Sequence, residues 1–294
     1  MISLQRNSNS QNYVEVKLPA MGSHFIYKGF AQRSFSKNDL KNAFNIAHKE
    51  VLRIQNKFSE FTPSIITKIN ENAGESEVEI DDETYYLLRE SKKYFDMTNG
   101  VFDISFAGFK NNKSKKSELD STNIYFDEKK IFLKSKNMKI SLGGIGKGYA
   151  VDLAFKTLEN LGFENFYVNG SGDIRVHSRS DAPRKWRIGL KNPFNINNYI
   201  GLIQLSNESV CTSGTYIQGE HISLSSEEIN EKLVSASIID SNCVHSDVMA
   251  TTLIALGKKK SLKFMEENKL MGLVITQSGE VLLSKKSIKH FGIK

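Results

Sequence analysis

The sequence predicts an α+β fold, a single compact domain with mixed β-sheets flanked by helices. Of its 294 residues, 39% are hydrophobic, which suffices for one large packed core. Segments with the alternating pattern of strands and segments with helical periodicity follow one another without a regular βαβ rhythm, which favours α+β over a doubly wound sheet. Residues 1–12 are polar and are expected to be flexible, so the domain is expected to span residues 13–294.

The N-terminal half is expected to contain a strand and two helices. Residues 13–18 alternate apolar and polar, as a half-buried strand does. The run Ser-Lys-Asn-Asp at 36–39 resembles a capping box, and apolar residues then recur at helical spacing as far as Phe58. The acidic run at 81–83 suits the start of a second helix, and the Asn-Gly pair at 99–100 suits its end.

The rest of the chain predicts further strands and two more helices. Residues 111–119, rich in Lys and Ser, are expected to form an exposed loop. One helix is expected from Tyr149 through Leu158, and another from its cap at Ser246 to Leu256. Extended segments are expected at 130–134, 138–142, 166–169 and 186–190, with a hairpin formed by 271–276 and 281–284.

The charge balance indicates a basic surface but no nucleic-acid site. Lys and Arg exceed Asp and Glu by 40 to 33, which gives a net charge of +7, and much of the excess lies in lysine-rich runs at 110–116, 258–260 and 285–289. No aromatic residues are regularly interleaved with these lysines, as single-strand binders require, so we interpret the runs as solvated surface. A basic surface still favours an anionic ligand.

The cysteine content and the apolar runs bear on the compartment. Cys211 and Cys243 have no metal-type spacing and are expected in the core. The first ten residues have no apolar run of signal-peptide length, and no later run is long enough to span a bilayer. We therefore expect a soluble protein that is not an integral membrane protein, cytoplasmic as the sequence stands. A chain trimmed and restarted at a methionine would look the same, so a periplasmic location stays open.

Four glycines and a lysine gather at 143–148, between an expected strand and an expected helix. Glycine lets backbone amides approach a phosphate, the helix N-terminus adds a partial positive charge, and Lys147 adds a full one. The spacing is not that of a Walker loop, because Ser141 stands where its first glycine would be and Gly148 replaces its Ser or Thr. The segment is interpreted either as a phosphate contact or as a tight structural turn.

Two further positions could carry chemistry. Asp247 and Thr251 are four residues apart and share one helix face, where a carboxylate and a hydroxyl can both reach a hard cation such as magnesium. The alternative is an Asp that stabilises the helix dipole and a Thr in the core. His221 is a candidate general acid or base, although a lone histidine can equally be structural.

Taken in chain order, these segments resemble the FAD:protein FMN transferase family, the ApbE-like flavin transferases. The resemblance extends from about residue 19 to about residue 257. Each piece alone is a weak signal, whereas the ordered set is specific. The matching pieces are 21–23, 58–64 with Asn70, 98–103, 142–152, 169–173, 212–216, His221 and 247–251.

The resemblance implies a reaction and a set of site residues. A threonine hydroxyl of an acceptor protein, a redox or electron-transfer protein, attacks the flavin-side phosphate of FAD, which leaves covalently bound FMN and AMP. The implied magnesium ligands are the backbone carbonyl of Gly144, Asp247 and Thr251. His221 is the implied proton-transfer group. The implied contacts with FAD are Met21, Phe61, Val101, Phe102, Asp103, Lys147 and His221.

The sequence departs from the family pattern at several places. After His221 the family usually continues as Ile-Ile-Asp-Pro, whereas residues 222–227 are Ile-Ser-Leu-Ser-Ser-Glu. Ser141 and Thr215 stand where the family usually has Asp, and Phe61 replaces Tyr. The implied metal pair, Asp247 and Thr251, is intact. The resemblance therefore supports binding of FAD and metal more directly than it supports transfer of FMN. Two alternatives therefore stay open: an FAD pyrophosphatase that uses water as nucleophile, and a non-catalytic FAD-binding protein.

Overall fold

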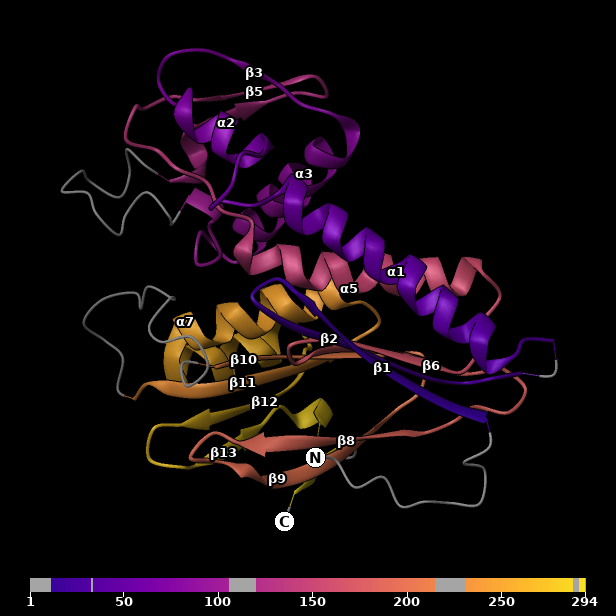
Figure 1. Cartoon of the computed structure of the whole chain (residues 1–294). Helices are drawn as coiled ribbons and strands as arrows, with labels where there is room; N and C mark the ends of the chain where they lie inside the picture. The colour runs from indigo at the N-terminus through magenta and orange to yellow at the C-terminus, as the bar shows by residue number, and fades with distance from the viewer. Residues whose placement is uncertain (1–11, 33, 106–119, 215–230, 288–290, 294) are drawn as a thin grey trace. The chain divides into compact units, whose positions relative to one another are not determined.

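A computed structural model describes residues 12–32, 34–105, 120–214, 231–287 and 291–293 (Figure 1). The chain forms two compact units, Met1–Leu52 with Lys147–Lys294, and Arg53–Gly146. Both contain helices and antiparallel strands, so the predicted α+β class is confirmed. A single domain over residues 13–294 stays a prediction. The flexible start also stays a prediction, because residues 1–11 lie outside the described part.

The larger unit is built on an eight-stranded sheet in which the strand pairs are antiparallel. The strands predicted near residues 13 and 166, and the hairpin about residues 277–280, are confirmed. In spatial order the strands are β1 (Tyr13–Ala20), β2 (Ser23–Phe30), β6 (Phe166–Gly170), β7 (Asp173–His177), β10 (Ser209–Gly214), β11 (Leu233–Asp240), β12 (Met271–Thr276) and β13 (Val281–Leu283).

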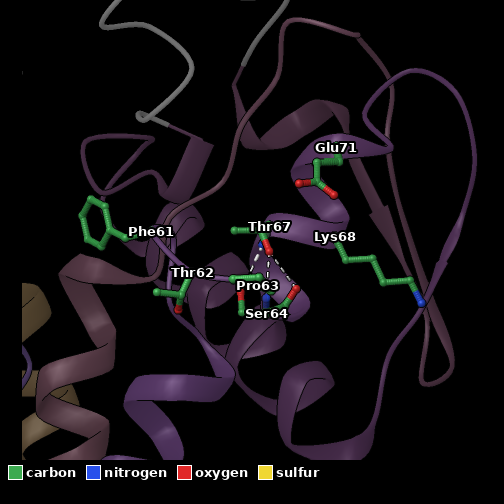
Figure 2. A pocket seen from close by; sticks show the side chains of 7 residues that line it. All are labelled: Phe61, Thr62, Pro63, Ser64, Thr67, Lys68 and Glu71. Carbon is green, nitrogen blue, oxygen red and sulfur yellow. Dashed lines mark hydrogen bonds between the residues drawn. The ribbon is translucent and has the colours of Figure 1, made fainter.

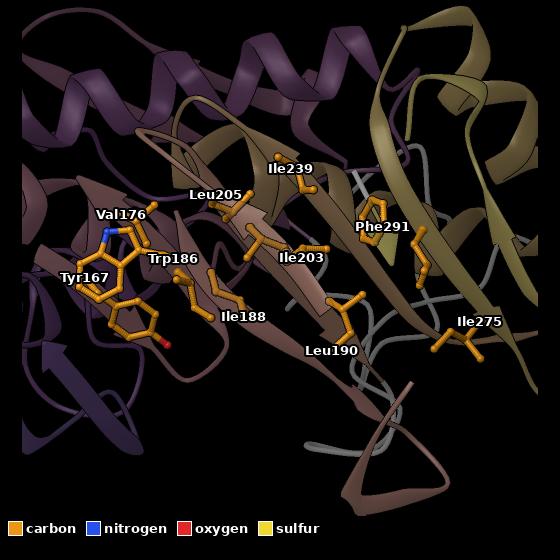
Figure 3. Packing of buried hydrophobic residues seen from close by; sticks show 13 residues of the cluster. Tyr167, Val176, Trp186, Ile188, Leu190, Ile203, Leu205, Ile239, Ile275 and Phe291 are labelled. Atoms are coloured by element: carbon orange, nitrogen blue, oxygen red, sulfur yellow. The ribbon is translucent and has the colours of Figure 1, made fainter. Parts of the chain in front are cut away.

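A three-stranded sheet packs on one face of this large sheet. It consists of β8 (Trp186–Asn192), β9 (Asn195–Leu205) and β14 (Phe291–Ile293), with β9 in the middle. Figure 3 shows the buried apolar cluster that joins the two sheets. Burial of such side chains stabilises the unit by roughly 25 cal/mol per Å² of apolar surface. The members include Tyr167, Val176, Trp186, Ile188, Leu190, Ile203, Leu205, Ile239, Ile275 and Phe291.

Helices cover the other face of the large sheet. Helix α7 (Cys243–Glu267) packs on β10 and β11, as Figure 1 shows, and is interrupted at Gly257, whose φ is 70°. The predicted cap at Ser246 is wrong, because Asn242 is the N-cap and Ser246 is buried within the helix, where its hydroxyl bonds to that of Ser209 at 2.8 Å. No helix in the described ranges is long and apolar enough to span a bilayer.

Helices α1 (Lys37–Lys57) and α5 (Gly143–Asn160) each begin in one unit and end in the other. The predicted capping box starts α1, because the Asp39 amide donates to the Ser36 hydroxyl at 3.2 Å and the Ser36 amide donates to the Asp39 carboxylate at 2.8 Å. Helix α5 begins six residues before the predicted start at Tyr149, so the glycines lie inside the helix.

The smaller unit contains α2 (Ile65–Glu71), α3 (Asp82–Met97), a short 3₁₀ turn (Ser121–Asn123) and a sheet of β3 (Val78–Glu79), β5 (Lys130–Leu133) and β4 (Ile124–Phe126). The predicted end of α3 is confirmed by the positive φ of Asn99 and Gly100. The extended segment expected at 138–142 is not a strand. The Asn70 amide instead satisfies the backbone of Ile140, accepting from its N–H at 2.8 Å and donating to its carbonyl at 2.9 Å.

Candidate functional site

Helices α5 and α7 are in close contact at Gly148. A Cβ added there would lie 2.6 Å from the carbonyl oxygen of Cys243 and 3.0 Å from the Cβ of Asp247. Neither neighbour is the far end of a flexible side chain, so no larger residue fits. A glycine inside a helix costs up to about 1 kcal/mol relative to alanine, and the close packing of the two helices offsets this cost.

A cluster of three charged side chains, of which the two carboxylates are buried and the lysine is partly exposed, lies beside this contact. The Lys147 ammonium is 2.6 Å from Asp173 Oδ2 and 3.8 Å from Asp247 Oδ1. The side chains of Asp173 and Asp247 are only 1% and 2% exposed. The amide of Gly148 donates to Asp247 Oδ2 at 3.0 Å, which fixes the carboxylate between α5 and α7. Two carboxylates therefore share one ammonium, and the cluster carries a net negative charge when all three groups are ionised.

The shared charge changes the acidity of these groups. Burial and the neighbouring Asp173 carboxylate raise the pKa of Asp247, against the opposing effects of Lys147 and the Gly148 amide. Burial alone would lower the pKa of Lys147, but the Asp173 and Asp247 carboxylates outweigh it and raise that pKa above its usual range. Lys147 is therefore a permanent cation, whereas Asp247 is a carboxylate that a second cation would help to ionise.

Thr251 lies one turn after Asp247 on α7, as the spacing predicted. Its hydroxyl is 3.0 Å from the hydroxyl of Ser213 at the end of β10. Oxygen donors of this kind suit a hard cation such as magnesium. Among the described residues, no group of three or more His, Cys, Asp and Glu side chains is placed to hold a metal. The two donors are of the type that magnesium takes, and its remaining ligands are usually waters and other oxygens.

A profile of the ApbE family matches residues 21–274. The chain belongs to the ApbE family. It is 27% identical over 290 residues to the FAD:protein FMN transferase of Buchnera aphidicola subsp. Schizaphis graminum, which covers 89% of this chain and 82% of that protein.

A second flavin transferase sequence and a solved structure are also similar to this chain. The FAD:protein FMN transferase of Vibrio cholerae serotype O1 is 27% identical over 165 residues, 52% of this chain, so the aligned part spans about half of that relative, 49% of its length. The crystal structure of the apo flavinyl transferase ApbE from Pseudomonas stutzeri is 19% identical and covers 96% of this chain and 97% of that one, with a TM-score of 0.81. This last likeness shows that the ApbE fold is shared over nearly the whole chain.

The smaller unit of this ApbE-family chain carries Phe61 on an ordered loop. The hydroxyl of Ser59 accepts from the amides of Phe61 and Thr62, each at 3.1 Å, and the Phe61 side chain is 88% exposed. Phe61 lines a cavity of about 390 Å³ (Figure 2) together with Thr62, Pro63, Ser64, Thr67, Lys68 and Glu71. An exposed ring held on a fixed backbone offers a flat face for stacking.

Residues 101–103 are engaged within the smaller unit. Phe102 is 5% exposed and packs so closely on Gly144 that an added Cβ at Gly144 would lie 3.0 Å from its ring. The Asp103 carboxylate accepts from the amide of Ser105 at 2.9 Å and also binds the hydroxyl of Ser121. Val101 is half-buried. These contacts show what holds the segment in place, and the predicted contact of all three residues with FAD stays a prediction.

Two remaining predicted residues are placed differently. Met21 has a φ of 52° and occupies, with Gly22, the two-residue turn between β1 and β2. His221 lies outside the described residues, as does the departing segment 222–227. Asp173 and Ser213 are not among the predicted site residues, although both lie in segments that match the family. The structure adds them through their contacts with Lys147 and Thr251.

Proposed function

We propose that the chain is a magnesium-dependent FAD:protein FMN transferase, the activity named for its relatives. A threonine hydroxyl of an acceptor protein attacks the flavin-side phosphorus of FAD. The new bond joins the threonine oxygen to that phosphorus, and the bond to the oxygen shared with the adenylate phosphate breaks. FMN remains as a phosphodiester on the acceptor, AMP leaves with the bonding electron pair, and the hydroxyl proton passes to a base.

The cluster of Lys147, Asp173 and Asp247 is the observation that carries this proposal. Lys147 is held at full charge by two carboxylates, so it can meet a pyrophosphate without losing its proton. Asp247 and Thr251 would hold magnesium, which when bound offsets the negative charge that develops on the phosphate oxygens. Binding of a dication also supplies the positive charge that the two buried carboxylates lack.

The proposed third magnesium ligand is the backbone carbonyl of Gly144, one turn before Gly148 in α5. In a regular α-helix the Gly148 amide would donate to that carbonyl. Here the Gly148 amide donates to Asp247. A backbone carbonyl has two lone pairs, so the Gly144 oxygen can bind a cation in addition to accepting a helix bond, and its assignment follows the family resemblance.

Two further roles, for Phe61 and His221, are proposed from the family resemblance. The exposed face of Phe61 would stack on the isoalloxazine ring and would replace the usual tyrosine without its hydroxyl. His221 would accept the proton of the attacking threonine. A redox or electron-transfer protein is the proposed acceptor, because covalently held FMN serves electron transfer.

The test combines two products in one reaction. The chain is incubated with FAD and magnesium, with and without a threonine-containing acceptor fragment, and AMP is measured by chromatography while flavin fluorescence is followed on the denatured acceptor. The proposal expects both AMP and labelled acceptor, and neither when the acceptor threonine is changed to valine. AMP without labelling would identify a pyrophosphatase. Tight magnesium-dependent FAD binding without AMP under any acceptor condition would identify a binding protein.

Substitutions of the proposed metal ligand and of the proposed base test their separate roles. Asp247→Ala should weaken magnesium-dependent FAD binding, and unchanged binding would remove Asp247 from the site. His221→Ala should lower turnover more than binding, and full turnover would make it a structural residue. Asp127→Asn is the control, because this exposed carboxylate of the smaller unit accepts from turn amides, those of Lys129 and Lys130.

A further inference from the structure

The N-terminus of α7 is capped by a side chain from another helix. Asp152 of α5 accepts from the amide of Cys243 at 2.9 Å through Oδ1 and from the amide of Val244 at 3.0 Å through Oδ2. The next amide, that of His245, donates to the Asn242 side chain at 2.9 Å. A helix begins with amides that have no partner inside it, so these bonds satisfy groups that would otherwise be left open.

Asp152 is itself held from the sheet. The Arg175 guanidinium lies 2.7 Å from Asp152 Oδ1 and stacks 3.9 Å from the centre of the Phe155 ring. Arg175 and Asp173 are two residues apart on β7 and so point to the same face of the sheet. This strand therefore supplies a partner of opposite charge to both Asp152 and Lys147 of α5.

The two helices are thus joined at two levels, one turn apart. At the first level the Gly148 amide binds the Asp247 carboxylate, and at the second Asp152 binds the first two amides of α7. With the first bond alone, α7 could pivot about the close contact at Gly148. Two bonded levels fix both the distance and the angle between the helices, and hence the place of every side chain on the first turns of α7.

We propose that Asp152 is a positioning residue for the magnesium site, which fixes α7 against α5 so that Asp247 and Thr251 stand where one cation can take both oxygens. This inference rests on the proposed function. Magnesium demands near-octahedral geometry at about 2.0–2.1 Å from each ligand, so a small rotation of α7 lowers its affinity. Groups that orient metal ligands typically change metal affinity by about 10–100-fold when removed.

The test compares Asp152→Asn with Asn242→Ala. Both weaken the capping of the same helix end, because asparagine can accept from only one of the two amides and alanine from none, but only the first loosens the tie between α7 and α5. Magnesium is titrated by calorimetry into each protein in the presence of FAD, and thermal unfolding is recorded alongside. We expect a few degrees of destabilisation in both, about tenfold weaker magnesium binding in D152N, and binding within about twofold of the wild type in N242A. At saturating magnesium, AMP release by D152N should return to within about twofold of the wild-type maximum.

Each outcome bears on the proposal. Wild-type magnesium affinity in D152N would overturn it, and equal weakening in N242A would show that capping strength alone is responsible. If D152N did not fold, Arg175→Gln would be used instead. This substitution keeps Asp152 and the α7 amides that it caps, and it removes the group that orients Asp152. About threefold weaker binding is then expected, and unchanged binding overturns the inference. A wild-type chain that binds magnesium but labels no acceptor would refute the transferase alone, and one that binds no magnesium would refute both.

Discussion

Replacing Asp247 by Asn should stabilise the metal-free protein at alkaline pH and leave it nearly unchanged at acidic pH. Burial and the Asp173 carboxylate raise the pKa of Asp247 from 3.8 to about 7 in the folded state. The neutral carboxyl therefore stabilises the fold fully below about pH 4, and this contribution is lost as the pH rises through about 7. Asparagine has the same shape and can still accept from the Gly148 amide, but it never ionises.

The magnitude follows from the size of this change. A rise of about three pKa units corresponds to roughly 4 kcal/mol between the two protonation states. Asp247 shares its charge with Lys147 and Asp173. We therefore expect the stability advantage of the variant over the wild type to grow by about 2 to 4 kcal/mol from pH 5 to pH 8. Urea unfolding with a chelator present, at both pH values, measures it. A difference between the proteins that stays within about 0.5 kcal/mol at both pH values would refute the reasoning.

Thr251→Val is the matched control, because it changes the other side chain of the proposed metal pair and introduces no change in titration. Its effect on stability should be the same at pH 5 and pH 8. Magnesium with FAD should reduce the stability advantage of Asp247→Asn over the wild type. A ligand present at 100 times its dissociation constant stabilises by about 2.7 kcal/mol, and only the wild type should gain it. Magnesium binding should tighten as the pH rises through about 7, because the carboxylate must lose its proton to bind.

Three further substitutions test the site from other directions. Lys147→Met should cost about 3 kcal/mol in urea unfolding because it leaves two buried carboxylates without their cation, whereas the control Lys130→Met breaks an exposed 2.6 Å pair and should change stability little. Gly148→Ala should cost about 2 kcal/mol by overpacking. Its control, Gly146→Ala, should gain up to about 1 kcal/mol, because an added Cβ there would meet no described atom within 4 Å. Equal effects of the two substitutions would contradict the close helix contact. Phe61→Ala should leave stability within about 0.5 kcal/mol, since the ring is exposed, yet weaken FAD binding about tenfold by fluorescence titration; unchanged affinity would exclude stacking.

The sequence predicted what depends on neighbouring residues. The capping box at 36–39, the end of α3 and the four-residue spacing of Asp247 and Thr251 are local, and each is found in the structure. Asp173 meets Lys147 across 26 residues, and Ser213 meets Thr251 across 38. Such pairs depend on which strand lies beneath which helix, and a single sequence does not contain that register.

The wrong predictions have a common physical cause in tertiary contacts. The glycines of α5 disfavour a helix, and the packing of Gly148 against α7 explains why the helix has a glycine at that position. Ser246 and Asn242 are both good N-cap residues, and the burial of Ser246 beside Ser209 decides between them. Residues 138–142 look like a strand, yet the Asn70 side chain satisfies the backbone of Ile140, 70 residues away.

The arrangement explains why one short segment of α5 carries so much of the site. Lys147 supplies the cation, Gly148 the close contact and the amide, and Asp152 the second bonded level. Their partners are scattered over β7 and α7, so a helix of this composition is useful only where those elements meet it. Ionised Asp247 destabilises the metal-free fold. The same carboxylate is therefore the group that a bound dication stabilises most. Stability and magnesium binding are therefore expected to change in opposite directions at Asp247, and in the same direction at Asp152.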